Sequence, residues 1–397
     1  RMECKKDFPI FQESNIVYLD NAATTQKPET VINSFRIYEK YNGNVHRCPH
    51  KWGRLMTDEY ERARQKAADF FHVKESGTVI FTRGATEGIN LVASSYLPYV
   101  AEDRNEVVVT VAEHHSNFVP WQQWCRKTGK KLIVLPTVEN ENVDLQMLEE
   151  AITERTALVA MAHLTNVFGI LQPVEEAAKL AHDKGALLLV DGAQAAGHIS
   201  VDFEKLGCDF YAVSGHKMYG PTGIGLLLGK KDILNQMEPW QYGGEMIDQV
   251  SIATSSFQEA PYRFEAGTPD YVGAVGLGKA LDYLSTFGME EIRKSEEQIF
   301  RAMVQKIRNL ERVKFPVDPE ISHGILSFEI EGLHPFDGAI LFDAQKIAVR
   351  SGMHCAQPLT KHYGLPEGTL RISVGMYTDM EDVEKFTEAL ERILERV

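Results

Sequence analysis

Between residues 78 and 229, short apolar runs alternate with segments of helical periodicity. Each run is rich in valine, isoleucine, leucine or phenylalanine and is continuously apolar rather than alternating. This pattern is typical of strands that are buried on both faces of a parallel sheet. The seven predicted strands are residues 78–82, 107–112, 131–136, 157–163, 186–191, 210–214 and 224–229.

Helical segments lie between most of these strands. Residues 145–153 follow Asp144, a favourable N-cap, and residues 173–184 begin with a proline and end before Gly185. Alternation of strands and helices predicts an α/β domain with helices on both faces of a mainly parallel, about seven-stranded sheet.

The pattern changes after about residue 270. Residues 275–287 and 289–310 predict long helices, and residues 324–330 and 369–374 predict shorter strands. Residues 378–381 (TDME) match a capping box that opens a final amphipathic helix. The inward face of this helix is expected to carry Val383, Phe386, Leu390, Ile393 and Val397.

These patterns predict two domains. We expect a large α/β domain over residues 19–270 and a smaller α+β domain over residues 271–397, which also includes residues 1–18. The chain of 397 residues is long enough for both.

The composition excludes several classes of protein. Hydrophobic residues make up 44% and charged residues 25% of the chain, which is too apolar for an intrinsically disordered protein. The formal net charge is −14, and this argues against nucleic acid as a partner because phosphates attract basic surfaces. Since no apolar run approaches the roughly 18 residues of a membrane helix, we also expect no membrane partner.

The N-terminal residues and the cysteines indicate a compartment. The first seven residues have no apolar stretch after their charges, so we expect no signal peptide. The odd number of cysteines and the absence of a CxxC pair argue against a disulfide framework and favour a reducing compartment. We therefore expect a cytoplasmic protein in which most cysteines are buried. The cysteines are Cys4, Cys48, Cys125, Cys208 and Cys355.

Polar residues follow five of the predicted strands where they end. In doubly wound folds, ligands bind beyond these carboxyl ends. The first such segment is a small-residue turn that opens a helix, which suits an anion because free N–H groups point outward there. The five segments are residues 83–88 (RGATEG), 113–116 (EHHS), 165–166 (TN), 191–194 (DGAQ) and 214–217 (SGHK).

Each of these residues also has a purely structural explanation. An aspartate after a strand often caps a helix, a histidine pair often lies on the surface or in the core, and a lone lysine is usually solvated. The convergence of five strand ends favours a functional site over these explanations.

The polar residues at these strand ends fit one chemistry if the anion bound at residues 83–88 is the phosphate group of a cofactor. A lysine can form a Schiff base with an aldehyde, and a carboxylate can keep a pyridinium nitrogen protonated; pyridoxal 5'-phosphate (PLP) requires both. Lys217 and Asp191 follow two nearby predicted strands, and the flat imidazole of His114 can stack on a ring.

Three motifs, residues 190–194 (VDGAQ), 214–217 (SGHK) and 350–358 (RSGMHCAQP), resemble those of class V fold-type-I PLP enzymes. Within that class they resemble the group II, SufS-like cysteine desulfurases and selenocysteine lyases. The matches occur in the family's order and span residues 20 to about 375. Supporting matches are residues 20–25 (DNAATT), 44–47 (NVHR), 84–87 (GATE), 113–115 (EHH), 219–225 (YGPTGIG), 263–269 (RFEAGTP) and 370–374 (LRISV).

The resemblance implies roles for four residues around the PLP ring. Lys217 resembles the lysine that binds the cofactor covalently, and Asp191 resembles the partner of the pyridinium nitrogen. By the same resemblance, His114 stacks on the ring and also has a catalytic role, and Gln194 reaches the phenolic oxygen.

The resemblance also implies a phosphate site shared between two subunits. Thr86, Ser214 and His216 resemble the phosphate ligands, and Thr268 resembles the phosphate-binding threonine that the other subunit supplies. A homodimer with active sites at its interface is therefore expected.

Four further residues are expected around the substrate. Arg371 and Asn166 match the residues that hold the substrate carboxylate, and Asn166 is also expected to contact the cofactor. His46 is expected near the mouth of the site. Cys355 matches the cysteine that takes up sulfur, so it should lie on an accessible loop.

The sequence departs from the family pattern at one position and offers one alternative. Met353 replaces the first histidine of the family loop Arg-x-Gly-His-His-Cys, which changes the local polarity beside the retained cysteine. His46, Cys48 and His50 alternate, and on a strand they would share a face that could bind a metal. Three ligands without a fourth rarely form a structural zinc site, so we expect no metal.

The resemblance implies a PLP-dependent cysteine desulfurase that converts L-cysteine to L-alanine. The sulfur would be held as a persulfide on Cys355 and passed to an acceptor, such as an iron–sulfur scaffold protein. One alternative is a selenocysteine lyase or cysteine sulfinate desulfinase, for which the cysteine matters less and L-selenocysteine is a possible substrate.

Two further alternatives remain. A class V aminotransferase or a kynureninase-like enzyme needs no cysteine in this loop, so Cys355 counts against it. A sulfur carrier without turnover needs only the cysteine, and the presence of Lys217, Asp191 and Arg371 counts against that.

Overall fold

The computed structural model describes residues 3–138 and 143–397 and contains a seven-stranded sheet in the order β2-β8-β7-β6-β5-β3-β4. Neighbouring strands are parallel, except that β8 runs antiparallel to both β2 and β7. The predicted mainly parallel sheet is therefore confirmed. Its strands are β2 (Gly77–Thr82), β3 (Glu106–Thr110), β4 (Lys131–Leu135), β5 (Thr156–Ala162), β6 (Leu187–Asp191), β7 (Phe210–Ser214) and β8 (Gly225–Lys230).

Both faces of this sheet are buried, and this explains why its strands are continuously apolar. Successive side chains of a strand point to opposite faces. On β3, Val108 joins one hydrophobic cluster and Val107 joins another. On β6, Leu188 belongs to the same cluster as Val108, and Leu189 belongs to the same cluster as Val107.

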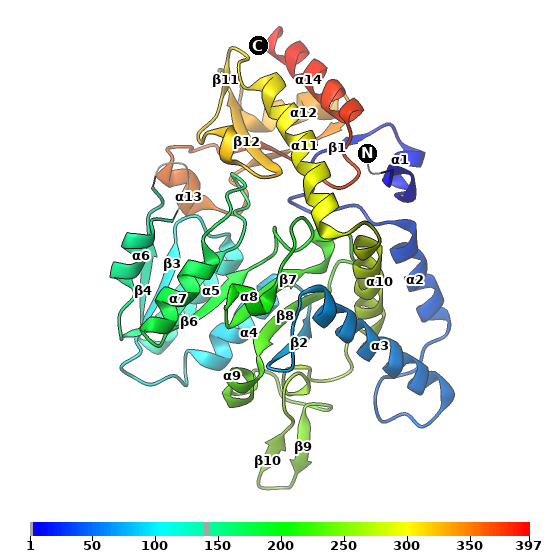
Figure 1. Ribbon diagram of the computed structural model, residues 1–397, viewed down its shortest axis with the longest axis vertical. Helices are drawn as coiled ribbons and strands as arrows, with labels where there is room; N and C mark the ends of the chain where they lie inside the picture. The colour runs from blue at the N-terminus through cyan, green and yellow to red at the C-terminus, as the bar shows by residue number, and fades with distance from the viewer. Residues whose placement is uncertain (1–2, 139–142) are drawn as a thin grey trace.

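Helices cover the two faces of the sheet, which lies in the lower part of Figure 1. One cluster contains side chains of α4 (Ala85–Tyr96), α5 (Val119–Thr128) and α9 (Lys231–Gln236). The other contains side chains of α3 (Lys51–Phe70), α6 (Leu145–Ala151), α7 (Val174–Asp183), α8 (Phe203–Leu206) and α10 (Tyr271–Phe287). Helix α2 (Glu29–Lys40) packs on α10.

A second, four-stranded antiparallel sheet lies in the upper part of Figure 1, in the order β11-β12-β15-β14. The N-terminal strand β1 (Val17–Tyr18) pairs with β13 (Ile347–Ala348) beside it. The sheet strands are β11 (Val313–Lys314), β12 (Ile325–Ile330), β14 (Arg350–Gly352) and β15 (Thr369–Ser373). The helices of this part are α1 (Ile10–Glu13), α11 (Met289–Ile307), α12 (Pro335–Asp343), α13 (Gln357–His362) and α14 (Met380–Leu394).

The start and end of helix α14 differ from the prediction. The capping box is formed by Asp379 and Asp382, one residue later than predicted. Each of these carboxylates accepts the backbone N–H of the other residue, so neither Thr378 nor Glu381 is needed. Val397 lies beyond the helix and is exposed, whereas the other four predicted inward residues are buried.

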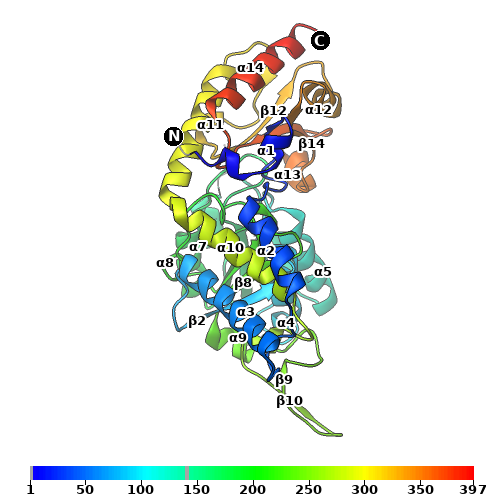
Figure 2. The same ribbon diagram turned by 90° about the vertical axis from the view of Figure 1, so that its right-hand side faces the viewer.

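A β-hairpin of β9 (Ile247–Val250) and β10 (Ser255–Phe257) extends away from the rest of the molecule in both views (Figures 1 and 2). No sequence pattern predicted it. Its strands are too short and too polar to show a clear alternation, and only Ile247 and Phe257 are half-buried. Within residues 3–138 and 143–397, none of the helices has the length and apolar character needed to cross a bilayer.

Candidate active site

A cavity of about 370 Å³ lies between the two sheets and collects most of the predicted site residues. It opens beyond the carboxyl ends of β5, β6 and β7, where the sequence analysis placed the site. Two predicted site residues, Thr268 and His46, do not line it. The predicted residues that line it are Thr86, His114, Asn166, Asp191, Gln194, Ser214, His216, Lys217, Cys355 and Arg371.

The parallel ladder brings the first of these side chains together. Strands β6 and β7 are neighbours, with Asp191 opposite Ala212, and they end at Asp191 and Ser214. A single 3₁₀ turn (Gly215–Lys217) then places Lys217 just beyond the strand end. The smaller sheet closes the opposite side with Arg371, which lies on the central part of β15.

Asp191 is buried and Lys217 is half-buried, and desolvation shifts the pKa of each so that its neutral form is favoured. Burial, together with the nearby charge of Arg371, lowers the pKa of Lys217 to about 8. Burial raises the pKa of Asp191, although the N–H of Ala193 donates to its Oδ1 at 3.0 Å. The cavity therefore contains an amine that is partly unprotonated near neutral pH, which is the form that attacks a carbonyl group.

Hydroxyl groups gather where helix α4 begins. The Thr86 and Ser116 hydroxyl oxygens lie 2.6 Å apart, and the N–H of Ala85 donates to the Ser214 hydroxyl at 2.9 Å. The Nδ1 atom of His216 lies 3.1 Å from the hydroxyl of Thr24. These donors beside the positive end of a twelve-residue helix form a suitable site for a phosphate group.

His114 and Gln194 border the same cavity. The ring of His114 is neutral because burial, followed by the charge of Lys217, lowers its pKa to about 3. Its Nδ1 accepts the N–H of Ser116 at 3.0 Å. The amide of Gln194 donates to the carbonyl of Ala22 at 2.8 Å, which fixes the direction of its side chain.

Arg371, Asn166 and His354 leave buried polar atoms without partners in the cavity wall. Arg371 donates to the carbonyl of Asn166 at 2.9 Å, and Asn166 donates to the carbonyl of His354 at 2.7 Å. Among the residues that the structure describes, Arg371 Nε, Asn166 Oδ1 and His354 Nδ1 have no hydrogen-bond partner. Since an unpaired buried polar atom is unfavourable, these atoms suit a charged, polar ligand with a carboxylate for Arg371.

Cys355 lies on a strained loop at the edge of the cavity. His354 and Cys355 have φ angles of 52° and 53°, in the left-handed region that costs roughly 1–2 kcal/mol for each such residue. The loop is held from the larger sheet's side by His115, whose N–H donates to the Cys355 carbonyl at 2.7 Å. From the other side, His354 Nε2 lies 2.9 Å from the hydroxyl of Thr369.

The other cysteines differ from Cys355 in exposure. All five lie in the described residues and all are free thiols, and Cys355 alone is exposed. Burial raises the pKa of Cys4 to about 12 and that of Cys125 to about 11, and it raises the pKa of Cys208 further. Because the thiolate is the nucleophile, Cys355 is the cysteine best placed to react.

Thr268 and His46 lie outside the wall of the cavity. Thr268 is exposed, and its hydroxyl contacts the Asn44 side chain at 3.4 Å. The strand on which His46, Cys48 and His50 would share a face does not form: His46 has a φ of 58°, and His50 caps helix α3. Within the described residues, no group of three His, Cys, Asp or Glu side chains is arranged to hold a metal ion.

Several residues of the cavity wall had no assigned role in the sequence analysis. They are Thr24, Ser116, Arg350 and His354. All four lie in sequence motifs named above, but a motif does not reveal which atoms come into contact between the two sheets. Arg350, for example, pairs with Asp20 at 2.7 Å, which joins residues that are far apart in the chain. Met353 is half-buried and lies outside the cavity wall.

Comparisons with known proteins agree with one another over nearly the full chain. The family model for aminotransferase class-V matches residues 17–386. A probable cysteine desulfurase of Halalkalibacterium halodurans is 46% identical, over 99% of this chain and 98% of the relative. A solved cysteine desulfurase of Thermococcus onnurineus NA1 has a TM-score of 0.93 and 37% identity, over 100% of this chain and 98% of that structure. The cysteine desulfurase CsdA of Escherichia coli has a TM-score of 0.91 and 36% identity, over 99% of this chain and 98% of that structure.

Proposed function

The chain belongs to the aminotransferase class-V family as a cysteine desulfurase, and we propose that it uses bound PLP to move sulfur from L-cysteine to Cys355. One observation carries this proposal: a half-buried lysine of lowered pKa and an exposed cysteine line the same cavity. An aminotransferase needs the lysine alone, and a sulfur carrier needs the cysteine alone.

The residues present fit PLP. Lys217 would bind its aldehyde group, and Asp191 would pair with its ring nitrogen. The hydroxyls at the start of α4 would hold its phosphate, and the neutral ring of His114 would stack on it. The unpaired atoms of Arg371 and Asn166 would receive the carboxylate of the substrate.

PLP supplies an electron sink that stabilises negative charge at the substrate's Cα. The side chains perform the remaining tasks. Lys217 Nζ, which is partly unprotonated near neutral pH, accepts the proton of Cα and later returns a proton to the product. Arg371 and Asn166, which are both buried, fix the orientation of the carboxylate.

Cys355 completes the reaction by accepting the sulfur. Its Sγ attacks the substrate sulfur, so a sulfur–sulfur bond forms as the carbon–sulfur bond breaks. L-Cysteine and the Cys355 thiol thus become L-alanine and a Cys355 persulfide, with no external oxidant. Because Cys355 is exposed, a thiol of an acceptor protein can then take the outer sulfur, as iron–sulfur cluster assembly requires.

The direct test supplies L-cysteine to the PLP-loaded protein with and without a thiol reductant. We expect alanine in both reactions, but repeated release of sulfide only with reductant, because the persulfide must be cleared before the next turnover. Formation of pyruvate or transfer of the amino group to a keto acid, without alanine, would contradict the proposal.

The covalent attachment of PLP should depend on pH in a specific way. The unprotonated amine of Lys217 attacks the aldehyde, and its pKa is lowered from 10.5 to about 8. We therefore expect the rate at which apo-protein gains visible absorbance after mixing with PLP to rise with pH and to level off above about 8. A rate that keeps rising toward pH 10.5 would show that Lys217 titrates like a solvated lysine.

We also propose a homodimer in which Thr268 serves the neighbouring subunit's phosphate site. What supports this is its exposure and its absence from the cavity of its own subunit. Thr268→Ala should weaken PLP binding by about tenfold, the effect of losing one hydrogen bond to a charged group. Dialysis against buffer followed by absorbance would measure the loss. Sedimentation of the parental protein as a fully active monomer would contradict the proposed dimer.

A further inference from the structure

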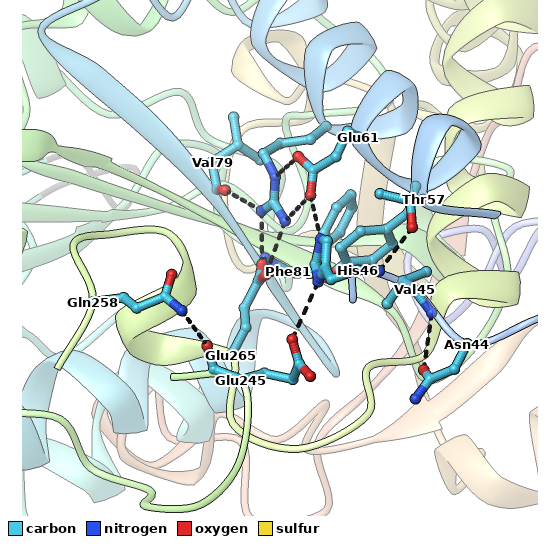
Figure 3. A network of polar contacts seen from close by, with 12 residues as sticks. Asn44, Val45, His46, Thr57, Glu61, Val79, Phe81, Glu245, Gln258 and Glu265 are labelled. Atoms are coloured by element: carbon cyan, nitrogen blue, oxygen red, sulfur yellow. Dashed lines mark hydrogen bonds and ion pairs between the residues drawn. The ribbon is translucent and has the colours of Figure 1, made fainter. Parts of the chain in front are cut away.

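A chain of ion pairs lies at the base of the loop that carries Thr268. It runs from Glu265 through Arg64 and Glu61 to His46 and Glu245, and we refer to these five residues as the Arg64 network (Figure 3). None of them lines the cavity. The network is therefore not part of the site described above.

Every N–H of Arg64 has a partner in this network or in the backbone beside it. Its Nη1 and Nη2 donate to the two Glu265 oxygens at 2.7 and 2.9 Å, which is a bidentate contact. Its Nε donates to Glu61 at 2.9 Å, and Nη1 also donates to the Val79 carbonyl at 2.8 Å. The guanidinium group can therefore adopt one orientation only.

Glu265 is held just as completely. Besides Arg64, its carboxylate accepts the N–H of Phe81 at 2.8 Å and the hydroxyl of Tyr60 at 3.1 Å. The Arg64 guanidinium lies over the rings of Tyr60, Phe81 and Tyr262, at 5.1, 4.8 and 5.3 Å from their centroids. The pair is thus fixed by helix α3, strand β2 and the loop that contains Glu265.

Further contacts link the network to the segment that ends at Thr268. His46 Nε2 lies 3.0 Å from Glu61, and His46 Nδ1 lies 3.5 Å from Glu245. The residue before Glu245, Gly244, accepts the N–H of Gly267 at 2.9 Å. Asn44, two residues before His46, contacts the hydroxyl of Thr268 at 3.4 Å. The segment from Glu265 to Thr268 is therefore held at both of its ends.

Packing of a hydrophobic core does not require such a network of paired charges. A buried ion pair adds little net stability over apolar residues of the same shape, and in some proteins its role is to specify one geometry. Here the geometry being specified is that of an exposed threonine hydroxyl that does not reach its own subunit's cavity. We infer that Arg64 is a positioning residue: through Glu265 it presents Thr268 to the phosphate site of a second copy of this chain. This inference rests on the dimer described under the proposed function.

Arg64→Lys tests the inference because it keeps the charge but loses the bidentate contact. We expect it to weaken PLP binding, measured by equilibrium dialysis, by about tenfold. Arg64→Lys combined with Thr268→Ala should bind PLP no more weakly than Thr268→Ala alone, because Arg64 acts through Thr268. The matched control is Arg62→Lys, on the same helix and paired with Glu59 at the surface, which should bind PLP like the parent.

A purely structural role predicts different results. In that case Arg64→Lys would lower the melting temperature of the apo-protein and leave PLP binding unchanged, or its effect would multiply with that of Thr268→Ala. Either result overturns the inference. If Arg64→Lys does not fold, Glu265→Gln replaces it, since glutamine keeps the size of the side chain and one oxygen that can accept the N–H of Phe81, but loses the charge that binds Arg64. The same outcomes are expected of Glu265→Gln.

Mixed dimers distinguish this inference from the proposed dimer itself. A Lys217→Ala chain cannot bind PLP covalently, but its Thr268 loop is intact, so it should restore parental PLP binding to an Arg64→Lys partner chain. The absorbance of covalently bound PLP reports that site alone. If Lys217→Ala chains rescue Thr268→Ala chains but not Arg64→Lys chains, Arg64 acts within its own subunit and the inference fails. If they rescue neither, the shared phosphate site is wrong, and the inference falls with it.

Discussion

Replacing Lys217 by alanine is expected to reduce the formation of alanine from L-cysteine by at least about 10⁴-fold. Both roles that we propose for the amine disappear at once: covalent attachment of the cofactor and proton transfer at the substrate's Cα. Its place in the cavity wall and its pKa of about 8 explain why a solvated lysine cannot replace it. The variant should also show no covalently bound PLP after borohydride treatment, whereas in the parent a peptide map should locate the reduced adduct on Lys217.

The control for this experiment is Lys184→Ala, which removes a lysine paired with Glu154 at the surface and should change neither result. An adduct on a lysine other than Lys217, or a Lys217→Ala protein that attaches PLP covalently as the parent does, would show that the cavity has been assigned wrongly.

Cys355→Ala should separate cofactor binding from sulfur transfer. The cysteine is exposed on a loop, and its thiol is not among the groups that would hold the phosphate. We therefore expect the variant to retain PLP and its colour. Its release of sulfide from L-cysteine should nevertheless fall by at least about a hundredfold, because the nucleophile that accepts the sulfur is missing.

Cys48→Ala is the matched control, since Cys48 is half-buried and does not line the cavity. Sulfide release at the parental rate by Cys355→Ala would remove the persulfide step while leaving the chemistry of Lys217 intact. Loss of PLP from the same variant would instead assign Cys355 a structural role.

L-Selenocysteine distinguishes the desulfurase from a selenocysteine lyase. The carbon–selenium bond is weaker than the carbon–sulfur bond, so its cleavage depends less on a nucleophile. We expect Cys355→Ala to lose much less activity with L-selenocysteine than with L-cysteine. A parental enzyme that uses only L-selenocysteine would favour the lyase.

The main sheet could be predicted from the sequence because its strands are buried on both faces. A strand such as β5, which is buried along its whole length, has to be continuously apolar. This pattern can be recognised in the sequence alone. Helix α3 was not predicted, since it is largely polar. Its buried Arg64 is stabilised by partners from β2 and from residue 265, and these contacts exist only after folding.

The same reasoning applies to the site. Strand ends carry their polar residues to one edge, so the grouping of Asp191, Ser214 and Lys217 followed from the predicted topology. Contacts between the two sheets did not follow, because no local pattern shows that Arg371 meets the Asn166 carbonyl. The roles of Thr268 and His46, and the domain boundaries near residues 19 and 270, remain predictions.

Sulfur transfer to Cys355 is tested by the mass of the Cys355 peptide after the PLP-loaded protein reacts with L-cysteine in the absence of reductant. We expect this peptide to gain the mass of one sulfur atom and one alanine to form for each sulfur gained. The added mass should disappear on reduction, and peptides that contain the other four cysteines should remain unchanged. Alanine formation with no sulfur on Cys355, or the same sulfur yield from Cys355→Ala, would contradict this transfer.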